Sequence, residues 1–224
     1  MRKLMGQGIG YLLLGLVLAL AVPAVQANQV NPGNNNVAPD ALTLGAGFTI
    51  DAVTSGAWSA GAGYGFGNYA EFVISDPSNV YCAGCLDFVI SVSLTGPTGE
   101  NINQVTAGDF QGFSTDMGYY TNASYGGCTG SPLVNPAEDS RSASGVTNRF
   151  NFGGNGDIQP GDCTALLVIE TSARAFMPGV LSFQDDQTAN VAGYQPLPEP
   201  GTMMLLGTGL VSLGGILRRR RTRS

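Results

Sequence analysis

The side chains with the types and spacing for chemistry are carboxylates and cysteines, because the chain contains no histidine. Without histidine, Ser-His-Asp and Cys-His catalysis are excluded, and so are His-ligated zinc and copper sites. Catalysis would have to rest on paired carboxylates, which hydrolyse glycosidic bonds when they lie about 5 to 10 Å apart. Since a sequence does not reveal that separation, we predict no catalytic residue, no metal site and no cofactor.

The four cysteines are an even number, which in an exported chain predicts disulfide bonds. The candidates are Cys82, Cys85, Cys128 and Cys163. Of the three connectivities, we favour Cys82–Cys85 with Cys128–Cys163. A redox-active C-x-x-C needs a strand-to-helix setting that lowers the thiol pKa, and residues 81–94 instead read as a loop that leads into a strand. A four-cysteine zinc site is the other alternative, although the last two cysteines do not form a second C-x-x-C.

One Gly-rich segment has oxygen ligands of the kind that calcium prefers. Asn151, Asn155 and Asp157 lie close together there, and Asp162 follows. Their spacing is not that of an EF-hand loop, and a solvated turn also explains the composition. We therefore interpret the segment as a turn and keep calcium as an alternative ligand.

A cluster of aromatic residues offers a second ligand hypothesis, because aromatic rings stack on sugars. Trp58 is the only tryptophan, and Tyr64, Phe66 and Tyr69 follow it. Glycines alternate with these residues, so they fit strand positions between glycine turns equally well. A cleft that binds carbohydrate is an alternative to this structural interpretation.

The N-terminus has the three parts of a secretory signal peptide. Arg2 and Lys3 precede the apolar stretch 9–22, and small residues follow it. We predict a signal helix within residues 1–27 and cleavage after Ala27. An uncleaved membrane anchor is the alternative.

The C-terminus combines Pro198-Glu199-Pro200, an uncharged run from Gly201 to Leu217, and five arginines, of which four are consecutive. A helix over the 17 residues of the run is about 25 Å long, close to the thickness of a hydrocarbon core of about 30 Å. We predict a transmembrane helix at about 201–217, rather than a buried terminal helix. Its membrane-stop residues are Arg218, Arg219, Arg220 and Arg221, which remain cytoplasmic by the positive-inside rule.

This C-terminus resembles the PEP-CTERM sorting signal of Gram-negative bacteria, which is also labelled an ice-binding protein C-terminal domain. The resemblance rests on the sorting motif Pro198, Glu199 and Pro200 and on the apolar run and basic tail behind it. It implies transient anchoring at the inner membrane and removal of the tail by an exosortase, a membrane-embedded cysteine transpeptidase-like enzyme. It also implies transit to the cell surface or extracellular matrix. Exopolysaccharide is a candidate partner, because genes for its synthesis often lie beside those of the family.

The exported part of the chain is strongly acidic. All sixteen acidic residues lie between Asp40 and Glu199, and the only cations there are Arg141, Arg149 and Arg174, which gives a net charge of −13. Such a field repels nucleic acid, so we predict no nucleic-acid partner.

Short apolar runs separated by Gly, Asn, Asp, Pro and Ser predict an all-β, antiparallel β-sandwich-like domain. The predicted strands are 69–75, 86–94, 146–152, 164–171, 180–183 and 189–194. In the strand 86–94, Phe88, Ile90, Val92 and Leu94 alternate with more polar residues and so predict one apolar face. The run 165–169 is continuously apolar and suits a central strand buried on both faces.

We therefore divide the chain into a signal peptide (1–27), a flexible leader (28–40), an exported β domain (41–194) and a sorting segment (195–224). The leading functional hypothesis is a non-enzymatic cell-surface or extracellular-matrix protein of a Gram-negative bacterium. The alternative is a module that binds calcium, carbohydrate or ice. A carboxylate-based hydrolase is the third hypothesis.

Overall fold

The computed structural model describes residues 29–42, 46–120, 133–153, 156–184 and 186–198. Within these residues all regular elements are β-strands, which confirms the predicted all-β class. The predicted signal helix (1–27) and transmembrane helix (201–217) lie outside the described residues. None of the described segments is a helix of the length and apolar character that crossing a bilayer requires.

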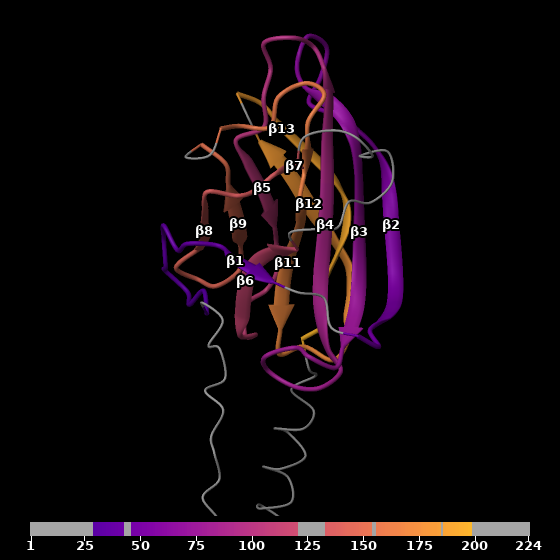
Figure 1. The fold of residues 1–224 in the computed structure, drawn as a ribbon, viewed down its shortest axis with the longest axis vertical. Coiled ribbons are helices and arrows are strands. Elements are labelled where there is room, and N and C mark those ends of the chain that lie inside the picture. The colour runs from indigo at the N-terminus through magenta and orange to yellow at the C-terminus, as the bar shows by residue number, and fades with distance from the viewer. Residues whose placement is uncertain (1–28, 43–45, 121–132, 154–155, 185, 199–224) are drawn as a thin grey trace, which may run out of the picture.

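The larger sheet has eight strands and forms one layer of the domain (Figure 1). Its strands, in spatial order, are β1 (Asp40–Leu42), β6 (Thr115–Tyr120), β11 (Leu166–Thr171), β4 (Cys85–Gly96), β3 (Phe66–Asp76) and β2 (Thr49–Ser59), with β10 (Cys163–Thr164) and β7 (Leu133–Val134) attached beside β4. Two short pairs, β1 with β6 and β7 with β10, are parallel, and the other pairs are antiparallel. The predicted antiparallel arrangement therefore holds except where short strands pair with distant parts of the chain.

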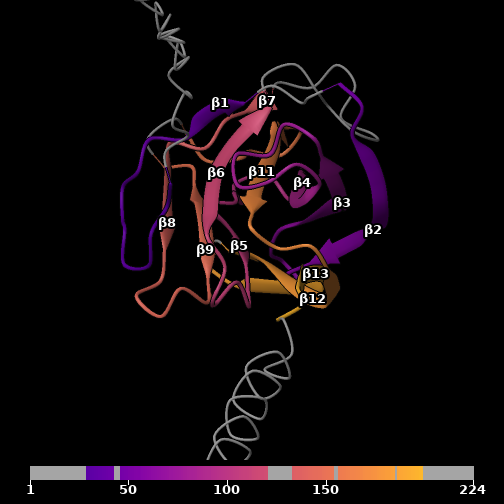
Figure 2. The same ribbon diagram turned by 90° about the horizontal axis from the view of Figure 1, so that it is seen from below.

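The smaller sheet has five strands, all antiparallel. They are β13 (Thr188–Pro196), β12 (Phe176–Gln184), β5 (Gln104–Ala107), β9 (Asn148–Asn151) and β8 (Glu138–Arg141). Figure 2 looks along the domain and shows the two sheets as opposing layers, as in a sandwich.

The main hydrophobic core lies between the two sheets. Phe88, Ile90 and Val92 of β4 enter it from the larger sheet, and Phe150 and Phe183 enter it from the smaller one. The apolar alternation predicted for residues 86–94 therefore marks the inward face of β4.

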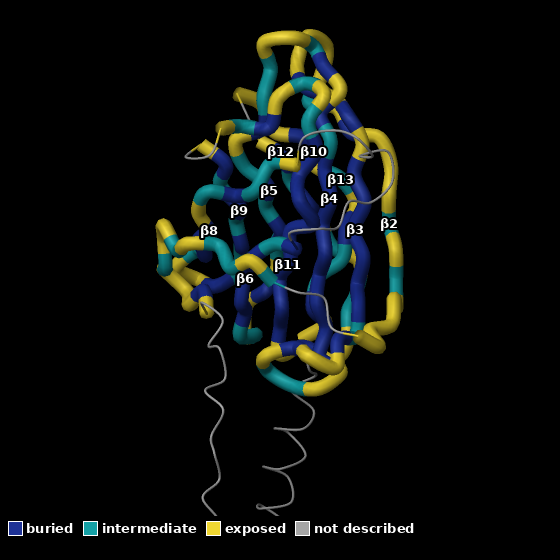
Figure 3. Tube along the Cα trace, in the orientation of Figure 1, coloured by how far each residue is buried: buried dark blue, intermediate teal, exposed yellow. Residues whose placement is uncertain are grey.

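The outer face of the larger sheet is also covered at its centre. Phe72, Val89 and Val168 are buried there in a second apolar cluster. All residues of β11 are consequently buried, as the continuously apolar run 165–169 predicts (Figure 3).

Strand β2 was not predicted, because its residues lack an apolar alternation. It is the edge of the larger sheet and pairs only with β3. Most of its side chains are exposed, including Ile50 at 53% (Figure 3). An edge strand of this kind is held by backbone hydrogen bonds to its neighbour, which leave little trace in side-chain patterning.

Residues 28–40 were predicted as a flexible leader, but the described part of this segment, residues 29–40, packs along the domain. Val30 is fully buried in the main core, Gln29 pairs with Asp116, and Val37 pairs with Asp139. The polar composition conceals this arrangement, because the segment is held by one buried valine, by backbone hydrogen bonds and by the Arg141 side chain, which donates to the Val30 carbonyl.

Candidate functional site

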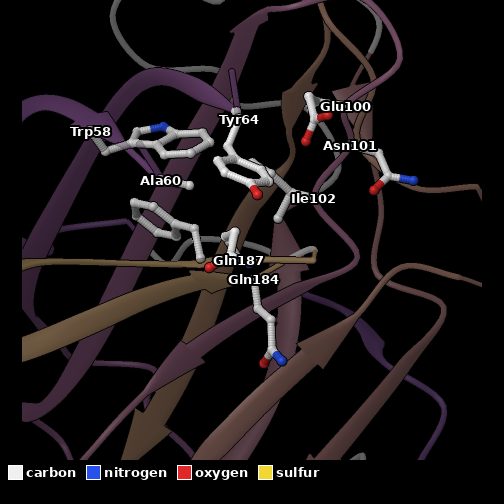
Figure 4. A pocket seen from close by; sticks show the side chains of 10 residues that line it. Trp58, Ala60, Tyr64, Glu100, Asn101, Ile102, Gln184 and Gln187 are labelled. Atoms are coloured by element: carbon white, nitrogen blue, oxygen red, sulfur yellow. The ribbon is translucent and has the colours of Figure 1, made fainter. Parts of the chain in front are cut away.

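A shallow hollow lies at one end of the sandwich, where three loops meet (Figure 4). Its empty space of about 230 Å³ includes open solvent, and little of it is enclosed. The hairpin between β2 and β3, the loop after β4 and the turn between β12 and β13 all contribute side chains. Its described lining consists of Trp58, Ala60, Tyr64, Gly65, Glu100, Asn101, Ile102, Phe183, Gln184 and Gln187.

The two aromatic residues of the hairpin have different roles in the hollow. Trp58 is only 5% exposed, its indole Nε1 donates a hydrogen bond of 3.1 Å to the Ser93 carbonyl, and its ring packs edge-on against Phe183. Trp58 is therefore a fixed part of the floor. Tyr64 is 39% exposed and stands at the mouth, with Trp58 on one side and Glu100 on the other (Figure 4). Tyr64 is thus the aromatic ring that a ligand can reach.

The polar lining consists of one carboxylate and three amides. Asn101 is oriented by a hydrogen bond of 2.8 Å from its Nδ2 to Asp157, and Gln184 and Gln187 are exposed. Planar amide and carboxylate groups of this kind donate to and accept from sugar hydroxyls, while an aromatic ring covers the apolar face of a sugar. No cation lies in the described lining, and Glu100 repels anions, so the hollow disfavours acidic ligands.

The structure separates the aromatic residues that the sequence grouped together. Tyr69 is a core residue whose hydroxyl donates to the Ala192 carbonyl at 2.9 Å, and Phe66 is exposed but does not line the hollow. Only Trp58 and Tyr64 of that group reach the hollow. The polar residues of the site were not predicted, because they come from loops with no recognisable pattern.

In the Gly-rich segment that was interpreted as a turn, with calcium as the alternative, the described side chains are bonded to other parts of the protein. Asn151 bonds to neighbouring strands, Asp157 accepts from Asn101, and Asp162 caps its own turn through the Gln159 amide. No group of three or more His, Cys, Asp or Glu side chains in the described part of the chain is arranged to hold a metal ion. Asn155 lies outside the described residues.

The local cysteine pair forms as predicted. Cys82 and Cys85 are joined in a disulfide at the end of the loop that leads into β4, so they offer no thiolates to a zinc ion. Cys163 is also disulfide-bonded. The remaining cysteine, Cys128, lies outside the described residues, so its pairing with Cys163 stays a prediction.

Three carboxylic side chains stand side by side on the outer face of the larger sheet. Asp87 of β4 lies opposite Glu170 of β11, and Glu170 lies opposite Asp116 of β6. We call these three residues the carboxylate row. Opposite residues on neighbouring antiparallel strands have Cβ atoms roughly 5 Å apart. The three carboxylic groups are therefore near neighbours, and they would repel one another if all were ionised.

The carboxylate row is buried, which changes its protonation. Asp87 and Asp116 are fully buried and Glu170 is 6% exposed. Burial raises the pKa of Asp87 and of Glu170 to about 8 and that of Asp116 to about 6, because the charged forms lose their hydration. Repulsion from nearby carboxylates is a smaller contribution to the same raised pKa values. A hydrolase would need such a pair within reach of substrate, whereas the hollow has Glu100 as the one carboxylate of its described lining.

The sorting motif starts where the sandwich ends. Strand β13 continues to Pro196, two residues beyond the predicted end of the domain, and the Leu197 amide still bonds to the Ala175 carbonyl at 2.9 Å. Pro198 is exposed. Glu199, Pro200, the membrane-stop arginines and the signal cleavage residue Ala27 lie outside the described residues.

Residues 196–221 match the family model of the PEP-CTERM protein-sorting motif. The match confirms the resemblance drawn from the Pro-Glu-Pro triplet and the basic tail. The motif implies exosortase-dependent sorting of an exported protein that is membrane-associated while it is sorted. Neither the curated proteins nor the solved structures contain a match to this chain.

Proposed function

We propose that this chain, which ends in a PEP-CTERM sorting motif, is a non-enzymatic cell-surface or extracellular-matrix protein of a Gram-negative bacterium. It is anchored transiently at the inner membrane and released when an exosortase removes its tail. The observation that carries the proposal is the sorting match at residues 196–221, directly behind a folded β domain. The predicted signal peptide, the disulfide at Cys82–Cys85 and the acidic exported surface support export.

The position of the motif suits access by a membrane-embedded enzyme. Pro198 and Pro200 lack amide donors and fix φ near −65°, so the triplet disfavours both a central strand and the interior of a helix. Glu199 is the only charged residue between Asp186 and Arg218, and it is therefore the one group there that can make a charge-assisted contact.

We expect Glu199→Gln to block release of the protein in its native host. The substitution keeps the shape of the motif and removes its charge, and a charge-assisted contact is worth roughly 1.5 to 3 kcal/mol. The released fraction should fall about tenfold or more, while the domain folds normally. Cell fractionation and the intact mass of each fraction measure this.

The control is Glu138→Gln, an exposed carboxylate on β8, which should be released like the wild type. The released wild-type protein should lack both residues 1–27 and the arginines 218–221. Normal release of the Glu199→Gln variant, or an arginine tail on released wild-type protein, would contradict the proposal.

A second candidate function, favoured by the hollow, is binding of a neutral polysaccharide. The support is the combination of exposed Tyr64 with Glu100, Asn101 and two glutamines around a space of about 230 Å³. Most of this space is open solvent rather than an enclosed cavity, so a sugar unit of a longer chain would lie against Tyr64 at the surface and would not be enclosed. Exopolysaccharide without acidic groups is the partner that this chemistry would retain.

We expect Tyr64→Ala to weaken binding of a neutral glucan or galactan about tenfold, because one aromatic contact contributes roughly 1.5 kcal/mol. Phe66→Ala is the matched control, since Phe66 is 45% exposed on the same hairpin but does not line the hollow. Affinity electrophoresis in polysaccharide gels measures both variants. Equal weakening by the two substitutions would refute the hollow as the site, and shortening of the glycan would instead support the hydrolase hypothesis.

A further inference from the structure

The loop between β3 and β4 lies against the carboxylate row. The Asn79 side chain donates from Nδ2 to Asp87 Oδ1 and, at 3.2 Å, to the Thr171 carbonyl at the end of β11. Its Oδ1 accepts from the backbone amides of Tyr81 and Cys82, at 2.8 and 3.3 Å. Residues 77–84, which we call the clasp loop, are therefore fastened to the row through one asparagine.

The two ends of the clasp loop are also fixed. Asp76 accepts from the backbone amide of Ser78 through Oδ1 at 2.7 Å, and its carbonyl accepts from the Gly84 amide at 3.1 Å. The Cys82–Cys85 disulfide closes the loop where it enters β4. The reactivity of this disulfide therefore reports on whether the clasp loop is seated.

The surroundings of the row offer few hydrogen-bond partners to an ionised carboxylate. Several buried oxygens there have no hydrogen-bond partner: Asp87 Oδ2, Asp116 Oδ2, Glu170 Oε2 and the hydroxyls of Tyr81 and Tyr120. An ionised carboxylate in this place would bury an unpaired charge, which costs several kcal/mol. A carboxylic acid avoids the buried charge, and its proton can be shared with a neighbouring carboxylate, as between Glu170 and Asp116.

We propose that the carboxylate row is a proton-operated latch, which holds the clasp loop while the row is protonated and frees it when the row ionises. The latch is independent of the sorting and polysaccharide proposals, because it involves neither the hollow nor the C-terminal motif.

The groups that face the row from neighbouring elements strengthen this dependence on protons. Asp76 on β3, Asp40 on β1 and Asp139 on β8 add further acidic groups. Burial raises the pKa of Tyr81 and of Tyr120, so the two phenols remain neutral and supply no charge. The cation of this region is Arg141, which acts on Tyr81, and its guanidinium is already bonded to backbone carbonyls. Ionisation of the row therefore places more negative charge beside other acidic groups. Among the described residues, no cation is free to neutralise it.

The direction of the pH effect follows from the raised pKa values. With the loop seated, burial raises the pKa of Asp116 to about 6 and that of Asp87 and Glu170 to about 8, from 3.8, 3.8 and 4.5. The hydrogen bond from Asn79 lowers the pKa of Asp87 and so opposes this effect, but burial outweighs it. The seated state therefore holds protons that the open, hydrated state has released. The clasp loop is therefore held most firmly against the row below about pH 4. The contribution of the row's protons to this holding is lost as the pH rises through about 6 to 8.

The test is the rate at which a phosphine reductant opens the Cys82–Cys85 disulfide at pH 5 and at pH 8.5. Alkylation and peptide mass spectrometry follow the two cysteines separately from Cys163, whose disulfide serves as the internal reference in the same molecules. We expect the rate, relative to that reference, to rise about tenfold or more in the wild type, because one unit of raised pKa corresponds to tenfold.

The double variant Asp87→Asn with Glu170→Gln keeps the shape of the row and removes two of its titrating groups. Its relative rate should vary less than about threefold between the two pH values, and Glu170→Gln alone should fall between it and the wild type. Asp109→Asn, at an exposed position with φ of 64° that asparagine tolerates, should behave like the wild type.

Three outcomes would overturn the latch. One is a wild-type rate that follows the Cys163 reference at both pH values. Another is an unchanged pH response in Glu170→Gln, which also decides the matter if the double variant fails to fold. The third is restoration of slow reduction at pH 8.5 by millimolar calcium chloride, since the row would then be neutralised by a cation rather than by protons.

Discussion

Replacement of Arg141 by methionine is expected to lower the free energy of unfolding by about 4 kcal/mol, which is a large part of the stability of a domain. Arg141 lies on β8 and is only 2% exposed. Its guanidinium donates to backbone carbonyls of four residues, at distances of 2.8 to 3.4 Å, namely Val30, Phe110, Phe113 and Gly145.

The four carbonyls belong to three segments of the chain, which this one side chain joins. Val30 belongs to the N-terminal segment, Phe110 and Phe113 to the loop between β5 and β6, and Gly145 to the hairpin between β8 and β9. Methionine fills much of the same volume but has no donor, so these buried acceptors would lose their partners. Each lost partner costs about 1 to 3 kcal/mol before relaxation, and water that enters recovers part of the total.

Urea denaturation followed by circular dichroism measures the effect. The matched control is Arg149→Met on the neighbouring strand β9, where the side chain is half-buried, and it should cost less than about 1 kcal/mol. Equal costs for Arg141→Met and Arg149→Met would mean that Arg141 does not join the segments. Faster proteolysis of residues 29–40 in the folded Arg141→Met variant would support its role in holding them.

The contrast between the predicted strands and Arg141 shows what a sequence can reveal. Residues 86–94 and 164–171 were predicted because burial repeats at each second residue or continues along the strand, and this pattern is local. Strand β2 was missed because an edge strand needs only backbone pairing. The packing of residues 29–40 depends on Val30 and on a guanidinium more than a hundred positions away, which no local pattern encodes.

The candidate sites also divide into those that a local sequence pattern predicts and those that form only through contacts between distant residues. The Cys82–Cys85 pairing was predictable because its two partners are three positions apart. The carboxylate row was not, because Asp87 follows the alternation of a strand with one solvated face, and only the pairing of β4, β11 and β6 brings its neighbours beside it. The hollow likewise combines three loops whose residues have meaning only once the sheets have formed.

Glu71 offers the clearest link between pH and the stability of the whole domain. It points from β3 into the space between the sheets and is fully buried, with Oε2 accepting from the Tyr194 amide at 2.8 Å and Oε1 without a partner. Gly193 makes room for it, because a Cβ at that position would lie 2.6 Å from Oε2. Burial raises the pKa of Glu71 to about 8, against 4.5 for a solvated glutamate, and the Tyr194 amide only partly opposes this.

The folded protein therefore keeps a proton on Glu71 that the unfolded chain releases above about pH 4.5. This contribution to stability is fully present below that pH and is lost as the pH rises through about 8. One such proton changes the free energy of unfolding by about 1.4 kcal/mol per pH unit within this window. We expect the wild type to become less stable between pH 5 and pH 9, and Glu71→Gln to lose roughly 3 kcal/mol less over the same range.

Urea titrations at a series of pH values give the two curves, with Glu138→Gln on the exposed side of β8 as a control that should follow the wild type. Glutamine can still accept from the Tyr194 amide through its side-chain oxygen, so Glu71→Gln should match the wild type near pH 5 and exceed it near pH 9. The carboxylate row titrates in the same range in both proteins, so its effect cancels in the difference between the curves. Parallel curves for wild type and Glu71→Gln would show that Glu71 is not the protonated group, and the inter-sheet carboxyl would then have to be ionised and hydrated in the folded domain.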